Sequence, residues 1–130
     1  MPIHLKVDHE AGLMTATAEG DITKVEFEEF LYATVSENTG GYRKLFDGRF
    51  ATTHMAAQDV FDFGLRMQAR HGIERTGPLA VVMQPHHYDL VSRVLGMLAT
   101  AERPMCLFEE LAAAHKWLES DGIRDWANRL

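Results

Sequence analysis

The residues best suited to chemistry gather between positions 47 and 54. Asp47 and Arg49 flank a glycine, and Thr52, Thr53 and His54 follow them. A carboxylate and a guanidinium beside a turn-forming glycine could orient a polar ligand, with Arg49 as an anion clamp and His54 as a general base. Equally, Asp47 could stabilise the turn while Arg49 pairs with a surface carboxylate.

The two threonines allow another interpretation of the same segment. A phosphate on Thr52 or Thr53 would lie near the expected start of a helix, where unpaired N–H groups favour negative charge. Threonine is also a preferred N-cap, a role that needs no modification. The segment therefore allows ligand binding, catalysis or a phospho-switch.

His86 and His87 are the other conspicuous pair. His86 is a second general-base candidate because it follows the apolar segment "LAVVM". Adjacent side chains on a helix point in different directions, and no His-x-x-x-His or His-x-His spacing accompanies this pair. No nucleophile elbow or glycine-rich phosphate loop is present either. We predict no metal site, no cofactor and no catalytic residue.

Composition limits the class of protein. The chain has 130 residues, 46% of them hydrophobic and 25% charged, which predicts one domain over residues 1–130. The net charge of −6, without a run of lysine or arginine, disfavours nucleic acid and anionic membranes as partners. The longest aliphatic run is too short to span a bilayer. The single cysteine, Cys106, excludes an internal disulfide, and we predict a cytoplasmic protein.

The hydrophobic periodicity predicts the elements that position these residues. "IHLKVD" and "LMTATAEG" alternate in the manner of strands and should form an antiparallel hairpin. Phe27, Phe30 and Leu31 then recur at helical spacing, and Thr23 with Glu26 resembles a capping box at the start of that helix. Further helices are expected at about 55–70, 86–102 and 109–120, and further strands at "YRKLFD", "LAVVM" and "MCLFE".

This order, ββαβαβαβα, predicts an α/β fold with a mixed five-stranded sheet. The N-terminal hairpin should be antiparallel and the later strands parallel, joined by βαβ crossovers, with residues 121–130 as a short amphipathic tail. Ligands of such sheets collect beyond the carboxyl ends of the parallel strands. Three segments should therefore meet at one rim, namely residues 47–54, 84–87 and 108–109.

One segment carries a family resemblance. "FEELAAAHKWL", residues 108–118, resembles the F-x-x-x-x-x-A-x-x-W-L close of the SpoIIAA-like family, with matches at Phe108, Ala114, Trp117 and Leu118. "GDITKVEFEEFL", "YRKLFDGR" and "GPLAVVM" resemble that family's first helix, third strand and fourth strand in the same order. The resemblance implies the α/β fold that the family shares with STAS and CRAL-TRIO domains.

The functions of those relatives give two expectations. STAS relatives are phosphorylation-controlled partners of other proteins, and CRAL-TRIO relatives carry lipids. The Asp-Ser-x-Gly sequence of the STAS switch is absent here, which leaves Thr52 and Thr53 as the nearest equivalents. We expect a non-catalytic domain, acting as a homodimer, that binds a protein partner or a small apolar ligand. A small enzyme and a threonine switch remain the alternatives.

Overall fold

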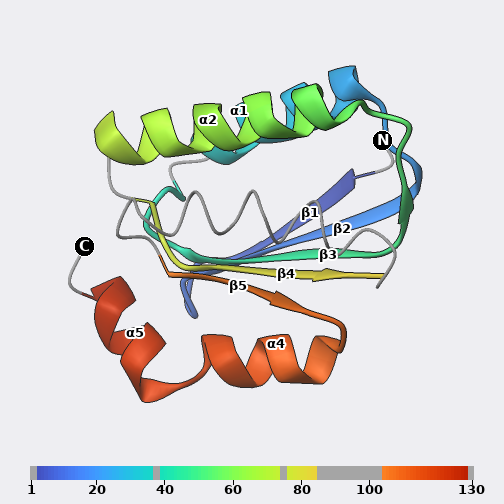
Figure 1. Cartoon of the computed structure of the whole chain (residues 1–130). Helices are drawn as coiled ribbons and strands as arrows, with labels where there is room; N and C mark the ends of the chain where they lie inside the picture. Colours follow the sequence, from blue (N-terminus) through green and yellow to red (C-terminus); the bar gives the residue numbers. More distant parts are fainter. Residues whose placement is uncertain (1–2, 37–38, 74–75, 85–103, 129–130) are drawn as a thin grey trace.

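The computed structural model describes residues 3–36, 39–73, 76–84 and 104–128 (Figure 1). Its elements, in chain order, are β1 (Ile3–Asp8), β2 (Leu13–Asp21), α1 (Lys24–Ser36), β3 (Arg43–Thr52), α2 (Ala57–Ile73), β4 (Leu79–Met83), β5 (Met105–Phe108), α4 (Leu111–Leu118) and α5 (Asp121–Asn128). The helix expected at 86–102, with His86, lies outside the described residues.

The five strands form one sheet in the order β1-β2-β3-β4-β5. β1 pairs with β2 antiparallel, and every later pairing is parallel. Because each crossover advances to the next strand in the same direction, α1 and α2 lie on one face of the sheet, while α4 lies on the other (Figure 1). The predicted mixed α/β fold is confirmed.

The start of α1 follows from a local sequence signal. The Thr23 backbone N–H donates to Glu26 Oε1 at 3.0 Å, and the Glu26 N–H donates to Thr23 Oγ1 at 3.3 Å. These reciprocal bonds form the predicted capping box and satisfy N–H groups that the first helical turn leaves open. The helix then packs Phe27 and Phe30 against Phe46 of β3, with ring centroids 5.8 and 5.5 Å from the Phe46 ring.

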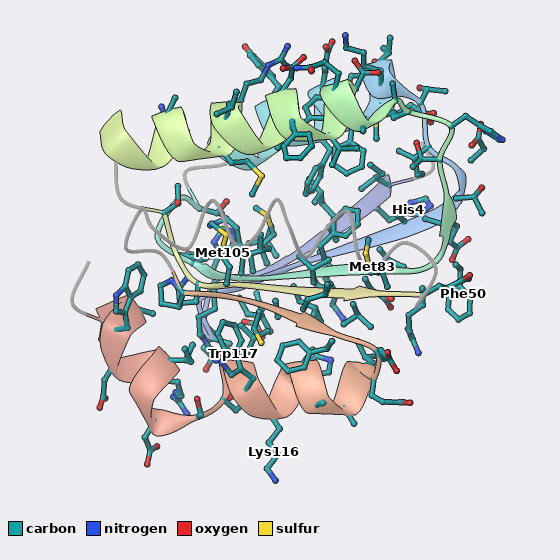
Figure 2. All side chains as sticks on the ribbon, in the orientation of Figure 1. His4, Phe50, Met83, Met105, Lys116 and Trp117 are labelled. Atoms are coloured by element: carbon teal, nitrogen blue, oxygen red, sulfur yellow. The ribbon has the colours of Figure 1, made fainter. Side chains whose placement is uncertain are left out.

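The opposite face of the sheet carries a separate core. Leu45, Ala80 and Val82 pack there against Ala114 and Leu118 of α4, all of them buried. Figure 2 shows Trp117 between α4 and the sheet, where its ring lies 5.9 Å from that of Phe108. The residues that match the SpoIIAA-like close are therefore the ones that attach α4 to the sheet.

The turn before β4 requires a glycine for steric reasons. The Gly77 N–H donates to the carbonyl of Gly40 at 2.8 Å, which brings two loops into backbone contact. A Cβ added at Gly77 would overlap the carbonyl oxygen of Tyr42. That space cannot hold a side chain unless the backbone moves.

We therefore expect Gly77→Ala to lower the free energy of unfolding by about 1–3 kcal/mol, the usual cost of forcing atoms into a filled site. Urea denaturation followed by circular dichroism measures the change. Gly122→Ala is the matched control, because a Cβ there meets no atom within 4 Å. The control should change stability by less than about 1 kcal/mol, and equal losses in both variants would contradict the steric argument.

Candidate functional site

Asp47 and Arg49 form a bidentate ion pair within β3. Arg49 Nε donates to Asp47 Oδ1 at 2.9 Å, and Arg49 Nη2 donates to Asp47 Oδ2 at 3.0 Å. The backbone N–H of Arg49 also donates to Oδ1, at 3.2 Å. The expectation that these residues lie in a loop is wrong, because β3 continues to Thr52. Arg49 pairs with Asp47 itself rather than with a distant surface carboxylate.

The Asp47 side chain is buried yet remains charged. Burial alone would raise the pKa of its carboxyl, but the hydrogen bonds and charge of Arg49 outweigh that effect and hold the pKa below its ordinary value. The charge of His115 on α4 acts in the same direction. The pairing with Asp47 in turn raises the pKa of the Arg49 guanidinium. The pair is thus an anchored, ionised element of the sheet.

A β-bulge in the β2–β3 pairing sets the orientation of Phe50 and Ala51, which follow Arg49 in β3. Thr17 pairs with Asp47 and Glu19 pairs with Phe50, so β3 contains one more residue than β2 across this step. The bulge turns Ala51 toward the core beneath α1, and Phe50 is left 61% exposed. The Arg49 guanidinium lies 5.0 Å from the centroid of the Phe50 ring. Figure 2 shows Phe50 at the carboxyl end of β3, pointing away from the sheet.

Neighbouring elements end at the same edge. Gln84, directly after β4, donates from Nε2 to the carbonyl of Arg49 at 2.6 Å. Glu110, the N-cap residue of α4, is close enough for its charge to contribute to the raised pKa of Arg49. The carboxyl ends of β3 and β4 and the start of α4 therefore meet around Arg49. We call this edge, with Asp47, Arg49, Phe50, Gln84 and Glu110, the rim.

The other predicted site residues lie beside the rim and are held by local bonds. Thr53 Oγ1 donates to the carbonyl of Ile22 at 2.8 Å and accepts from the Met55 N–H at 3.2 Å. The N-cap interpretation of the threonines is wrong, since α2 begins only at Ala57. Thr52 is exposed at the end of β3.

His54 lies on the same side of the molecule but in an open position. Its Nδ1 is 3.0 Å from Asp21 Oδ1, and its side chain is 89% exposed. Among the residues that the structure describes, no group of three His, Cys, Asp or Glu side chains could hold a metal ion. The helices within these described ranges also lack the length and hydrophobicity of a membrane-spanning segment.

The fold and the rim define a class of protein. It is a mixed α/β domain in which an antiparallel hairpin precedes parallel strands in sequential order, with polar groups at their carboxyl ends. The sequence profile of the SpoIIAA-like family matches residues 13–119, and the chain belongs to that family. The resemblance of its closing segment is thereby confirmed.

Comparison with solved structures agrees on the fold. The chain is similar to a crystal structure of an uncharacterised protein from the DUF3478 family of Shewanella loihica PV-4, described as having a SpoIIAA-like fold. The two chains share 18% identity, with a TM-score of 0.60 over 89% of this chain and 91% of the other. A search of curated proteins found no match.

The ion pair predicts a defined response to acid. Because folding lowers the pKa of Asp47, the stabilisation from its charged form is present above pH 3.8, the ordinary value, and is lost as the pH falls toward the folded value. Asp47→Asn should lower the free energy of unfolding at pH 7 by about 1–3 kcal/mol, since it weakens bonds to a charged partner. The difference in the free energy of unfolding between wild type and Asp47→Asn should become smaller below pH 3.8. Urea titrations across the pH range measure it.

Asp59→Asn is the control for this measurement. Asp59 pairs with Lys24 at 3.3 Å on the surface, where an ion pair contributes at most about 1 kcal/mol. A difference between wild type and Asp47→Asn that stays constant as the pH falls would contradict the assigned ionisation.

Proposed function

We propose that this chain is a non-catalytic binding domain that contacts a protein partner through the rim. The observation that carries the proposal is the pairing of exposed Phe50 with the anchored guanidinium of Arg49. Aromatic and arginine side chains dominate the binding energy of protein interfaces. A contact residue of this kind is expected where the fold places ligands, at the carboxyl ends of parallel strands.

Anchoring supports this assignment on energetic grounds. A contact side chain that is already fixed loses less entropy on binding than a mobile one. Asp47 fixes the Arg49 side chain with two hydrogen bonds, and Gln84 fixes its backbone with a third. The bulge holds Phe50 outward. The rim is thus pre-organised before any partner arrives.

The same contacts weigh against the alternative functions. Arg49 already has a bidentate carboxylate partner, so an anion clamp would have to displace Asp47. His54 has an exposed acidic partner and lies in solvent, where a general base gains little from its surroundings. The Thr53 hydroxyl already donates a hydrogen bond, and Thr52 is the more open position for a phosphate. Met67 of α2 packs against Leu79 and Val81 in the core, so its side chain is not free to line a groove for an apolar ligand.

The test compares two exposed aromatic residues. Phe50→Ser removes the proposed contact, and Tyr32→Ser removes an aromatic side chain on α1 that is also exposed. Proteins that bind to immobilised wild type and to immobilised Tyr32→Ser should not bind to Phe50→Ser. The affinity of Phe50→Ser for a purified partner should be roughly tenfold or more below that of wild type, as for a central aromatic residue of an interface. Equal retention by all three proteins would overturn the role of the rim.

A second copy of the chain is the partner that the sequence leads us to expect. Sedimentation velocity over a range of concentrations should then show a dimer for wild type and Tyr32→Ser and a monomer for Phe50→Ser. A monomer in every case would exclude the homodimer and leave a different protein as the partner.

Native mass spectrometry separates a protein partner from a carried ligand. The proposal predicts the bare chain mass, or twice that mass, in freshly purified protein. A reproducible additional mass of lipid size would contradict it and favour the apolar ligand.

A further inference from the structure

A cleft of about 220 Å³ lies at the opposite end of the sheet from the rim. Gly12, Tyr42 and Arg43 line it from the amino ends of β2 and β3, and Arg124, Ala127 and Asn128 line it from α5. None of these residues belongs to the rim. This volume is below the roughly 300–1,000 Å³ of pockets for drug-sized ligands, so any ligand of the cleft must be smaller than that class.

The Arg43 side chain is the unusual feature of this cleft. It is only 5% exposed, and three of its N–H groups are bonded. Nη1 donates to the carbonyl of Leu118 at 2.8 Å and to Glu119 Oε1 at 3.0 Å, and Nη2 donates to the carbonyl of Ala11 at 2.9 Å. A guanidinium has five N–H donors. Its Nε–H and one Nη2–H thus have no acceptor among the described residues.

Donors in this state strongly favour an acceptor from the cleft. Buried N–H groups are nearly always satisfied, and one left open is costly, most of all on a charged group. The Nε–H and the remaining Nη2–H are both charge-assisted donors, which bind the oxygens of a carboxylate more strongly than a neutral acceptor. The chemistry of Arg43 therefore selects an oxyanion.

The surrounding charges favour an anion with a single negative charge. Arg124 also lines the cleft, and its Nη1 lies 3.7 Å from Glu119 Oε2. Glu119 thereby balances one of the two arginines, and no acidic side chain is among the described residues that line the cleft. One positive charge is left for a ligand.

Apart from the two arginines and Asn128, the cleft is lined by Tyr42 and by alanine and glycine residues. Ala127 and Gly12 expose no polar side-chain atoms, and the Tyr42 ring is held by a 3.0 Å hydrogen bond between its hydroxyl and His9 Nδ1. We infer that this cleft is a ligand site, separate from the rim, that takes a small monocarboxylate with an apolar body. The carboxylate bonds to Arg43 and Arg124, and the body packs against Ala127 and Tyr42.

Titration with benzoate, followed by ¹H–¹⁵N NMR, tests the inference. The backbone amides of Gly12, Gly41 and Asn128 and the Nε–H of Arg43 should shift in a saturable way. Benzamide, which has the same shape without the charge, should produce no such shifts. Arg124→Gln should weaken benzoate binding roughly tenfold, the effect of losing one charge-assisted bond.

Two further variants make the result specific. Arg66→Gln is the matched control, since Arg66 lies on α2 with 57% of its side chain exposed against 56% for Arg124. It should bind benzoate as wild type does. Ala127→Leu should abolish binding by filling the cleft. Absent shifts, shifts of equal size with benzamide, or equal weakening by Arg124→Gln and Arg66→Gln would each overturn the inference.

Discussion

Pairing of β3 on both of its edges is the constraint on which the rest of the structure depends. β2 and β4 both pair with this strand in parallel, so its backbone groups are satisfied and its side chains alternate between the two faces. Phe46 enters the core beneath α1, and Leu45 enters the core above α4. The same strand carries Arg43 at its amino end and Asp47 with Arg49 toward its carboxyl end. Both candidate sites are thus attached to one rigid element.

The two ends of β3 use arginine for different purposes. Arg49 is satisfied by Asp47 and therefore presents its guanidinium face and Phe50 to the surface. Arg43 is buried and bonds mainly to main-chain carbonyls, which joins the β1–β2 turn to the end of α4. A cation near the last turn of a helix also complements the helix dipole. The exposure of Arg49 and the burial of Arg43 thus follow from the different acceptors available at the two ends.

Much of the fold could be predicted because its signals are local. The capping box at Thr23 and the alternation in β1 each depend on residues close in sequence. The extent of β3 could not be predicted in this way. Gly48 is a residue type typical of turns, but it lies within β3. A Cβ added there would lie 3.2 Å from the Phe46 ring and 3.3 Å from the Val82 carbonyl oxygen. This steric constraint depends on the packing of β4 against β3, so it cannot be recognised from the sequence around Gly48.

The candidate sites were predictable to a similar degree. The meeting of strand ends at the rim follows from topology, and the predicted site residues Asp47 and Arg49 lie there as an ion pair. The exposed position of Phe50 depends on a bulge that only the pairing with β2 defines. Arg43 was missed because a basic residue at the start of a strand usually lies in solvent, and its acceptors, Ala11 and Leu118, are distant in sequence.

The sequential strand order has a consequence for synthesis on the ribosome. Each parallel strand can join a neighbour that has already emerged, so the sheet can grow in the direction of translation. The face that holds Leu45, Ala80 and Val82 is different, because its cover, α4, is made only after all five strands. A nascent chain therefore exposes that apolar surface from the pairing of β3 with β4 until α4 has emerged, and this is the interval in which chaperone protection matters most.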